Sequence, residues 1–160
     1  VGALAEMRRV LKRGAPALAP VSGARMKTGL HQHTGSAVET REETYTVMQA
    51  VDTRYMKFAP DIGQAQKGGT DAAQLVKDFS SIIAHMHLKD YKGWEQMAGY
   101  CPLGEGVVDL KSVLATMEKA NPNANIMHEL DGSPKMTYTP RQTAEIGKAY
   151  LQKLGYTFRT

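Results

Sequence analysis

The residues of this chain with the clearest capacity for chemistry are histidines and acidic residues placed where apolar runs end. Residues 84–90 have the sequence Ala-His-Met-His-Leu-Lys-Asp, in which His85 and His87 alternate with apolar residues. Because side chains in a strand alternate between two faces, both imidazoles are expected on one face. Neutral imidazole is a common ligand of divalent ions. The segment is therefore either part of a metal site or a buried strand with hydrogen-bonded histidines.

Three other expected strands end in residues of the same types. Their approximate ranges and end residues are 26–32 with His31 and His33, 56–61 with Asp61, and 125–130 with Glu129 and Asp131. The strand near 84–89 also ends in Lys89 and Asp90. In parallel α/β folds the carboxyl ends of the strands form the active face. Asp, His and Glu together supply the mixed oxygen and nitrogen donors that suit Mn, Mg, Co or Zn.

The segments between these strands predict the helices that would position them. Helical periodicity is expected over 3–12, from the Thr40 capping box to about Val51, after Thr70 or Asp71, after Asp109, and from Thr139 to Gly155. Residues 62–64 and 67–69 are predicted to form a loop, and a long loop is expected over 91–108. Four alternations of strand and helix favour parallel strands joined by crossover helices.

Composition narrows the class of protein. A chain of 160 residues with 42% hydrophobic and 22% charged residues is typical of one globular domain. The net charge of +4 comes from scattered basic residues, which argues against nucleic acid as a partner. No run of apolar residues approaches the ~20 of a membrane helix, so no membrane partner is expected. Cys101 is the one cysteine and excludes an internal disulfide, while export or a cytoplasmic location both stay open.

Four motifs in order resemble the xylose isomerase-like TIM barrels, the sugar phosphate isomerase/epimerase superfamily. They are Asp61-Ile62-Gly63-Gln64, the segment 85–90, Leu103-Gly104-Glu105-Gly106 with the residues up to Asp109, and Glu129-Leu130-Asp131. The resemblance covers about Met26 to Thr160 and implies strands five to eight, so that residues 1–160 form the C-terminal half of a single barrel domain. A full barrel needs about 250 residues. The segment is therefore expected to be unstable alone, to pair with another chain, or to belong to a longer protein.

The resemblance also implies a ligand set. In the family a divalent ion is held by Glu, Asp, His and Glu from successive strands, and Asp61, His87 and Glu129 match the last three. The first Glu has no counterpart, and His31 falls nearest to its place. The family often has a substrate-binding His where this chain has Gln64.

The resemblance implies a metal-dependent isomerase or epimerase acting on a keto-sugar or cyclitol. A proton beside a metal-polarised carbonyl would be moved by Glu129, with His31 opposite it and Lys89 stabilising the developing negative charge. Substrate contacts are expected from His33, Gln64, His85 and Trp94. The sugar or polyol is the expected partner, and a homo-oligomer is left open.

Two other functions stay open. The second interpretation is a metal-dependent lyase of the inosose dehydratase type, or a hydrolase, on the same scaffold, and the missing first Glu favours it over a strict epimerase. A non-catalytic sugar-binding barrel is the third interpretation. The strand period further predicts that Met127 and Glu129 face inward with His87, while His128 points outward as a packing residue.

Overall fold

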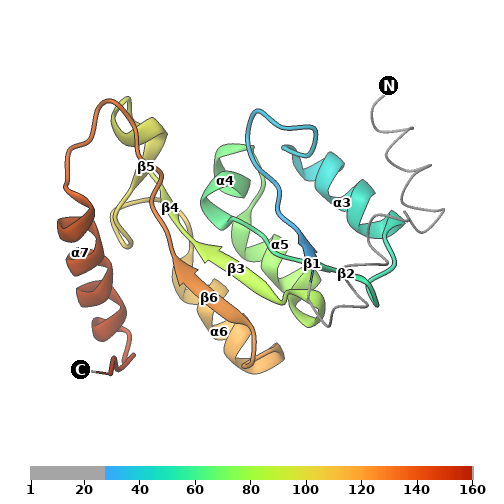
Figure 1. Cartoon of the computed structure of the whole chain (residues 1–160). Coiled ribbons are helices and arrows are strands. Elements are labelled where there is room, and N and C mark those ends of the chain that lie inside the picture. Colours follow the sequence, from blue (N-terminus) through green and yellow to red (C-terminus); the bar gives the residue numbers. More distant parts are fainter. Residues whose placement is uncertain (1–27, 160) are drawn as a thin grey trace.

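Four parallel strands form the centre of the computed structural model, which describes residues 28–159 (Figure 1). They are β1 (Thr28–Leu30), β2 (Met56–Phe58), β3 (His85–Leu88) and β6 (Asn125–His128). β1 pairs with β2 and β3 pairs with β6, in parallel in both cases. The expected parallel strands are confirmed, whereas the helix expected over 3–12 lies outside the described residues.

A thin seam joins these two strand pairs. Isolated parallel bridges link Phe58 to Ile83 and Asp61 to His87, which gives the spatial order β1-β2-β3-β6. The N–H of Ala84 donates to the carbonyl of Phe58 at 3.0 Å, and that of His87 donates to the carbonyl of Pro60 at 2.9 Å. The carboxyl ends of β2 and β3 therefore lie side by side, which brings Asp61 next to His87.

The helices expected from capping signals form where the side chains can satisfy first-turn amides. They are α3 (Arg41–Ala50), α5 (Ala72–Phe79), α6 (Leu110–Ala120) and α7 (Pro140–Lys153). Thr40 and Thr139 each form a reciprocal capping box with the residue three positions later. Of the two candidate caps Thr70 and Asp71, the structure uses Asp71, whose side chain accepts from the Gln74 N–H.

The hydrophobic core lies between the strands and the helices that cover them. Met86 and Leu88 of β3 are buried at 0% and 2% exposure, whereas His85 and His87 between them are only partly buried. The apolar face of β3 packs in one cluster with residues of α5 and α6, including Leu75, Val76, Leu110 and Val113. Each fully buried side chain of this kind contributes about 1.5–3 kcal/mol. This burial fixes which face of β3 carries the histidines.

The prediction of a loop over residues 62–64 and 67–69 is wrong for residues 62–64 and for Lys67. Residues Ile62–Lys67 form the short helix α4, because the Asp61 side chain accepts a hydrogen bond from the Gln64 N–H and caps it. The helix was not predicted because Gly63, Gly68 and Gly69 give the segment a low helix propensity. Within the long loop 91–108 the structure adds a small antiparallel pair, β4 (Asp90–Tyr91) with β5 (Tyr100–Cys101).

Two short 3-10 helices, η1 (Ser80–Ile82) and η2 (Gln96–Gly99), complete the described elements. Among the helices of residues 28–159, none has the length and apolar character needed to cross a membrane.

Candidate metal centre

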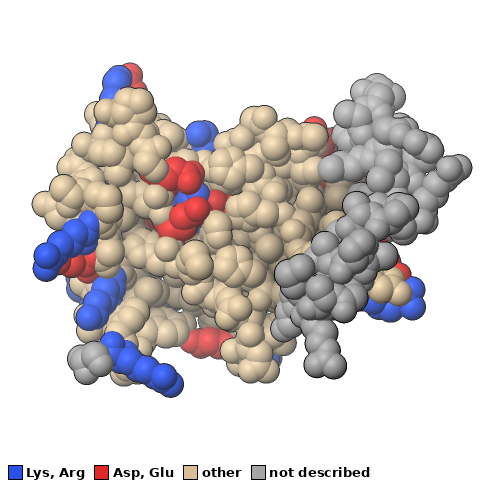
Figure 2. Space-filling model, in the orientation of Figure 1, with Lys and Arg blue, Asp and Glu red and all other residues tan. Residues whose placement is uncertain are grey.

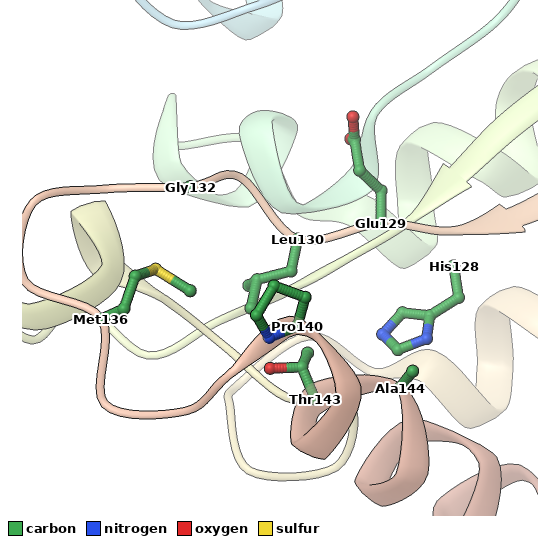
Figure 3. A pocket seen from close by; sticks show the side chains of 8 residues that line it. All are labelled: His128, Glu129, Leu130, Gly132, Met136, Pro140, Thr143 and Ala144. Carbon is green, nitrogen blue, oxygen red and sulfur yellow. The ribbon is translucent and has the colours of Figure 1, made fainter.

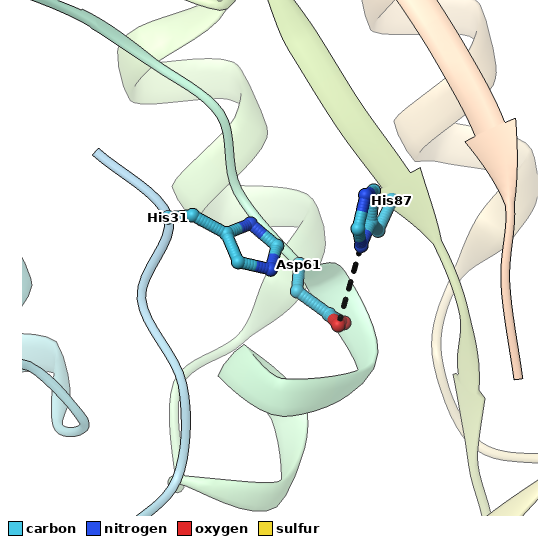
Figure 4. A group of neighbouring side chains, drawn as sticks. All are labelled: His31, Asp61 and His87. Atoms are coloured by element: carbon cyan, nitrogen blue, oxygen red, sulfur yellow. Dashed lines mark ion pairs between the residues drawn. The ribbon is translucent and has the colours of Figure 1, made fainter. Parts of the chain in front are cut away.

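Three ligand-type side chains meet at the carboxyl ends of β1, β2 and β3 (Figure 4). His31, Asp61 and His87 each offer a ligand atom, and these atoms lie within 4.8 Å of one another. Asp61 is fully buried, His87 is partly buried and His31 is exposed. The three residues come from successive parallel strands, so the order of the strands alone brings together side chains that lie far apart in the sequence.

Asp61 is fixed by its two carboxylate oxygens. Oδ1 accepts from the Gln64 N–H at 3.0 Å, which is the cap of α4. Oδ2 lies 3.9 Å from Nδ1 of His87 and 2.6 Å from Nζ of Lys89. Burial raises the pKa of Asp61, while the Lys89 ammonium and the Gln64 amide oppose that rise. One oxygen therefore holds the helix, and the other faces the centre.

His31 is oriented as a metal-binding imidazole is. Its Nδ1 lies 2.7 Å from the carbonyl oxygen of Ala59. A carbonyl can only accept, so Nδ1 carries the proton and the lone pair remains on Nε2. A hydrogen bond from the second ring nitrogen to a carbonyl is the usual support for a ligating histidine.

Glu129 adds a carboxylate beside this group. Its Oε2 lies 2.7 Å from Nδ1 of His87 and 2.7 Å from Nζ of Lys89. The buried Nδ1 of His87 forms no hydrogen bond of acceptable geometry with any described residue. Buried polar atoms without partners are uncommon. Ligand atoms bound at about 2.0–2.2 Å to one ion lie about 3 Å apart. The donor set of His31, Asp61, His87 and Glu129 therefore fits a divalent ion of the borderline type.

Lys89 lies behind the group and ties three carboxylates together. Its Nζ is 2.6 Å from Asp61, 2.7 Å from Glu129 and 2.9 Å from Asp131, and the lysine side chain is fully buried. Burial acts to lower the pKa of Lys89, but the carboxylates outweigh it and the pKa is raised. Lys89 in turn outweighs the burial of Glu129 and lowers the pKa of that carboxyl.

The charges of this cluster favour binding of a further cation. When ionised, the three carboxylates around the one ammonium leave two negative charges uncompensated, and one divalent cation would balance them. Figure 2 shows acidic side chains gathered around a basic one near the middle of the face that it presents. Because Lys89 is fully buried, its ammonium cannot contact a substrate directly, and the expected part of Lys89 in catalysis stays a prediction.

The glycine of the Asp61-Ile62-Gly63-Gln64 motif makes room for Lys89. A Cβ at Gly63 would stand 2.6 Å from Cγ of Lys89, closer than carbon atoms approach in real structures. A glycine at this position therefore lets the aliphatic stem of Lys89 pack directly against α4.

The four residues expected to bind substrate lie in different settings. Nε2 of His33 is 2.6 Å from Nε2 of Gln64, and His33 is two positions along the chain from His31 of the metal group. His85 lies beside His87 with ring centroids 5.0 Å apart, and burial lowers the pKa of His85. Trp94 donates from Nε1 to the carbonyl of Tyr100 at 2.6 Å, a contact within its own loop. Their binding of a substrate stays a prediction.

The expected sides of Glu129 and His128 are confirmed, whereas the inward face of Met127 stays a prediction. Glu129 and His128 point to opposite sides of the chain in Figure 3, where both line a pocket together with Leu130, Gly132, Met136, Pro140, Thr143 and Ala144. The His128 ring packs against α7, since a Cβ at Gly147 would collide with it. Burial lowers the pKa of His128. His128 is a packing residue, and Glu129 belongs to the metal group side.

Sequence reasoning missed the part played by Asp90. This buried carboxylate accepts from the N–H groups of Tyr91, Gly104, Gly106 and Val108 at 2.9–3.1 Å. Asp90 thereby fastens the Leu103–Asp109 motif beside the centre. The sequence signal that could have revealed this contact was the pair of glycines around Glu105, because a Cβ at Gly106 would collide with Asp90.

This fold and site define a class of protein. The family model of xylose isomerase-like TIM barrels matches residues 2–154, and the chain belongs to that family. The structure is consistent with a partial barrel of parallel strands.

The curated relatives that this chain matches include inosose dehydratases. An inosose dehydratase of Geobacillus kaustophilus is 27% identical over 144 residues, covering 81% of this chain and 46% of the relative. The chain thus spans about half the length of the curated relatives it matches.

Solved structures show the same fold. A sugar phosphate isomerase/epimerase from Parabacteroides distasonis superposes with a TM-score of 0.72 at 18% identity, over 96% of this chain and 55% of that one. The IOLI protein with a binding zinc atom superposes with a TM-score of 0.70 at 16% identity, over 94% and 55%.

Proposed function

We propose that this chain is the metal-binding half of a divalent-metal-dependent lyase that removes water from a keto-polyol of the inosose type. The observation that carries the proposal is the convergence of His31, Asp61 and His87, with Glu129 at 2.7 Å from His87, on the active face of a barrel. The inosose dehydratases among the relatives support the substrate class.

The side chains that would hold the ion are Asp61, His87 and Glu129, with His31 in the fourth place. The donor set accepts Mn, Co or Zn and tolerates Mg. The relative with a bound zinc atom makes zinc the first ion to test. When bound, such an ion supplies a Lewis acid that polarises the substrate carbonyl and acidifies the neighbouring C–H bond.

Exposure supports Glu129 as the residue that transfers the proton. The Asp61 side chain is fully buried and cannot reach a substrate, whereas 31% of the Glu129 side chain is exposed. Lys89 keeps the pKa of Glu129 below its usual range, so that the carboxylate is ionised at neutral pH. Of the two carboxylates in the proposed ligand set, Glu129 is thus the one that can serve as a base.

A single carboxylate suffices for elimination on one face of the substrate. Glu129 takes the proton from the carbon next to the carbonyl, the C–H electron pair forms the new double bond, and the hydroxyl on the next carbon leaves. The same carboxyl group returns its proton to that hydroxyl, and water is released. No external oxidant or reductant is needed, because the substrate loses only the elements of water and no net electrons are transferred.

Isomerisation or epimerisation is the second candidate. An epimerase must take a proton from one face of a carbon and return it on the other, which requires a second acid. His31 lies on the side of the group opposite Glu129 and is the residue available for that step. The ring centroids of His31 and His87 are 4.5 Å apart. The structural likeness to a sugar phosphate isomerase/epimerase favours this alternative.

Mass spectrometry of the products separates these functions. The complete protein loaded with zinc or manganese would be incubated in D₂O with an inosose and with a panel of keto-sugars. In a parallel incubation in H₂O, loss of 18 mass units is expected for the inosose, and Glu129→Gln should abolish it. Deuterium uptake without loss of water would instead establish the isomerase or epimerase. Retention of metal and sugar without either change would leave a binding module.

A further inference from the structure

The carboxamide of Gln64 uses its full hydrogen-bonding capacity. Its Oε1 accepts from the N–H of Thr34 at 3.1 Å and from Oγ1 of Thr34 at 2.6 Å. Its Nε2 contacts Nε2 of His33 at 2.6 Å and Oδ2 of Asp131 at 3.0 Å. A carboxamide has two acceptor lone pairs and two N–H bonds. Gln64 is buried, and all four positions are taken.

These partners fix which way the carboxamide faces. The N–H of Thr34 can only donate, and an ionised Asp131 carboxylate can only accept. Exchanging the oxygen and nitrogen of Gln64 would set donor against donor at Thr34 and acceptor against acceptor at Asp131. The NH₂ group therefore faces His33, and Nε2 of His33 must accept. The His33 proton is then on Nδ1, which lies 3.3 Å from the carbonyl of Thr34.

The two histidines of this strand end are thus left in different states. His31 has Nδ1 bonded to the carbonyl of Ala59 and a free lone pair on Nε2 toward the metal group. His33 has its only lone pair held by Gln64. Sequence alone treats the two residues of the His31-Gln32-His33 pair alike, and the surrounding contacts separate them.

We propose that Gln64 is a positioning residue that holds the lone pair of His33 and thereby leaves His31 as the histidine of this strand end that binds the metal ion. This inference rests on the proposed metal-dependent function. Asp131 supports Gln64 while also holding Lys89, so the carboxamide is anchored to the same cluster that carries the ion.

Removing each histidine in the complete protein tests the assignment. Zinc affinity would be measured by competition with a chromophoric chelator for His31→Ala and for His33→Ala, which is the matched control from the same strand end. Loss of an outer partner of a ligand costs about 10–100-fold in affinity. His31→Ala should exceed about 100-fold, while His33→Ala should stay below about tenfold. The reverse order would overturn the proposal.

The NMR signals of the histidine nitrogens test directly which histidine binds the metal and which tautomer His33 adopts. In the wild-type protein labelled with ¹⁵N-histidine and loaded with ¹¹³Cd, His31 and His87 should show coupling to the metal. His33 should show the shifts of a fixed Nδ1–H tautomer and no coupling. In Gln64→Met, which removes all four hydrogen bonds at similar volume, the His33 signals should move to averaged tautomer values. Gln66→Met on the same helix should leave them unchanged.

The outcomes are separable. Coupling of His33 to cadmium in the wild-type protein refutes the inference, as do His33 signals that are identical in wild type and Gln64→Met. If Gln64→Met does not fold, the wild-type spectrum and the two alanine variants still decide. A complete protein that binds neither zinc nor cadmium would instead overturn the proposed function itself.

Discussion

Replacing Lys89 by methionine should make the folded state depend on a bound cation. Methionine keeps the aliphatic stem that packs on Gly63 and removes the ammonium that holds Asp61, Glu129 and Asp131. Removing one partner of a buried ion pair costs about 3–5 kcal/mol, because the other charge is left buried. Side chains of Glu129 and Asp131 keep 31% exposure, so water screens two of the three contacts. We therefore expect the lower end of the range, about 3 kcal/mol.

Urea unfolding of the complete protein in EDTA at pH 7 measures this loss. With a slope of about 1–3 kcal/mol per molar urea, the midpoint should fall by at least about 1 M. Lys77→Met, which changes an exposed lysine of α5, is the control and should stay within about 0.5 kcal/mol. Zinc or manganese should restore part of the loss in Lys89→Met, because the ion neutralises the same carboxylates. A Lys89→Met protein as stable as the control would refute the account of the cluster.

The pH dependence of the loss follows from the shifted groups. The raised pKa of Lys89 stabilises the fold below the ordinary lysine value, and this contribution is lost as pH rises through the folded pKa. The lowered pKa of Glu129 stabilises the fold above the ordinary glutamate value, and that contribution is lost as pH falls through the folded pKa. The difference between wild type and Lys89→Met should therefore be largest between roughly pH 5 and 10.

Two further substitutions test the site and its loop. Asp61→Asn keeps an oxygen for the cap of α4 but removes the buried charge, so zinc retention after dialysis should be lost, whereas His128→Ala should retain zinc and lower only the melting temperature. Gly106→Ala places a methyl group against Asp90 and should destabilise the protein by about 1–3 kcal/mol in urea unfolding, with a loop 103–108 more open to proteolysis. Retained zinc in Asp61→Asn, or unchanged stability in Gly106→Ala, would count against these assignments.

The strands and most helices could be predicted because their signals are local. Alternation around His85 and His87 fixed the faces of β3, and Thr40 and Thr139 marked helix starts by side chains that cap nearby amides. Helix α4 was missed because its six residues include a glycine, and its stability comes from the Asp61 cap and from packing on Lys89. The loop 103–108 is held by Asp90, which accepts a hydrogen bond from a residue 18 positions away, and no local pattern reveals that contact.

The place of the centre was predictable, and its contacts were not. Ligand-type residues at strand ends indicated a site at the carboxyl ends of the strands, because parallel strands bring such ends together. The resemblance to the family singled out Asp61, His87 and Glu129, and their binding of a metal ion stays a prediction. The buried triple contact of Lys89 and the difference between His31 and His33 arise from hydrogen bonds across strands. Spacing cannot encode which lone pair is free.

The seam between β2 and β3 has a consequence for how the molecule opens. Two inter-strand hydrogen bonds, from the N–H groups of Ala84 and His87, cross it within the described chain, whereas residues of both flanking ladders pair in continuous register. Local opening favours places with few bonds, so the amide protons of Ala84 and His87 should exchange with solvent earlier than those inside the ladders. Asp61 stands on one side of this seam and His87 on the other. An ion held by both would clamp the two strand pairs together, and its arrival would be recorded as slowed exchange at these two amides.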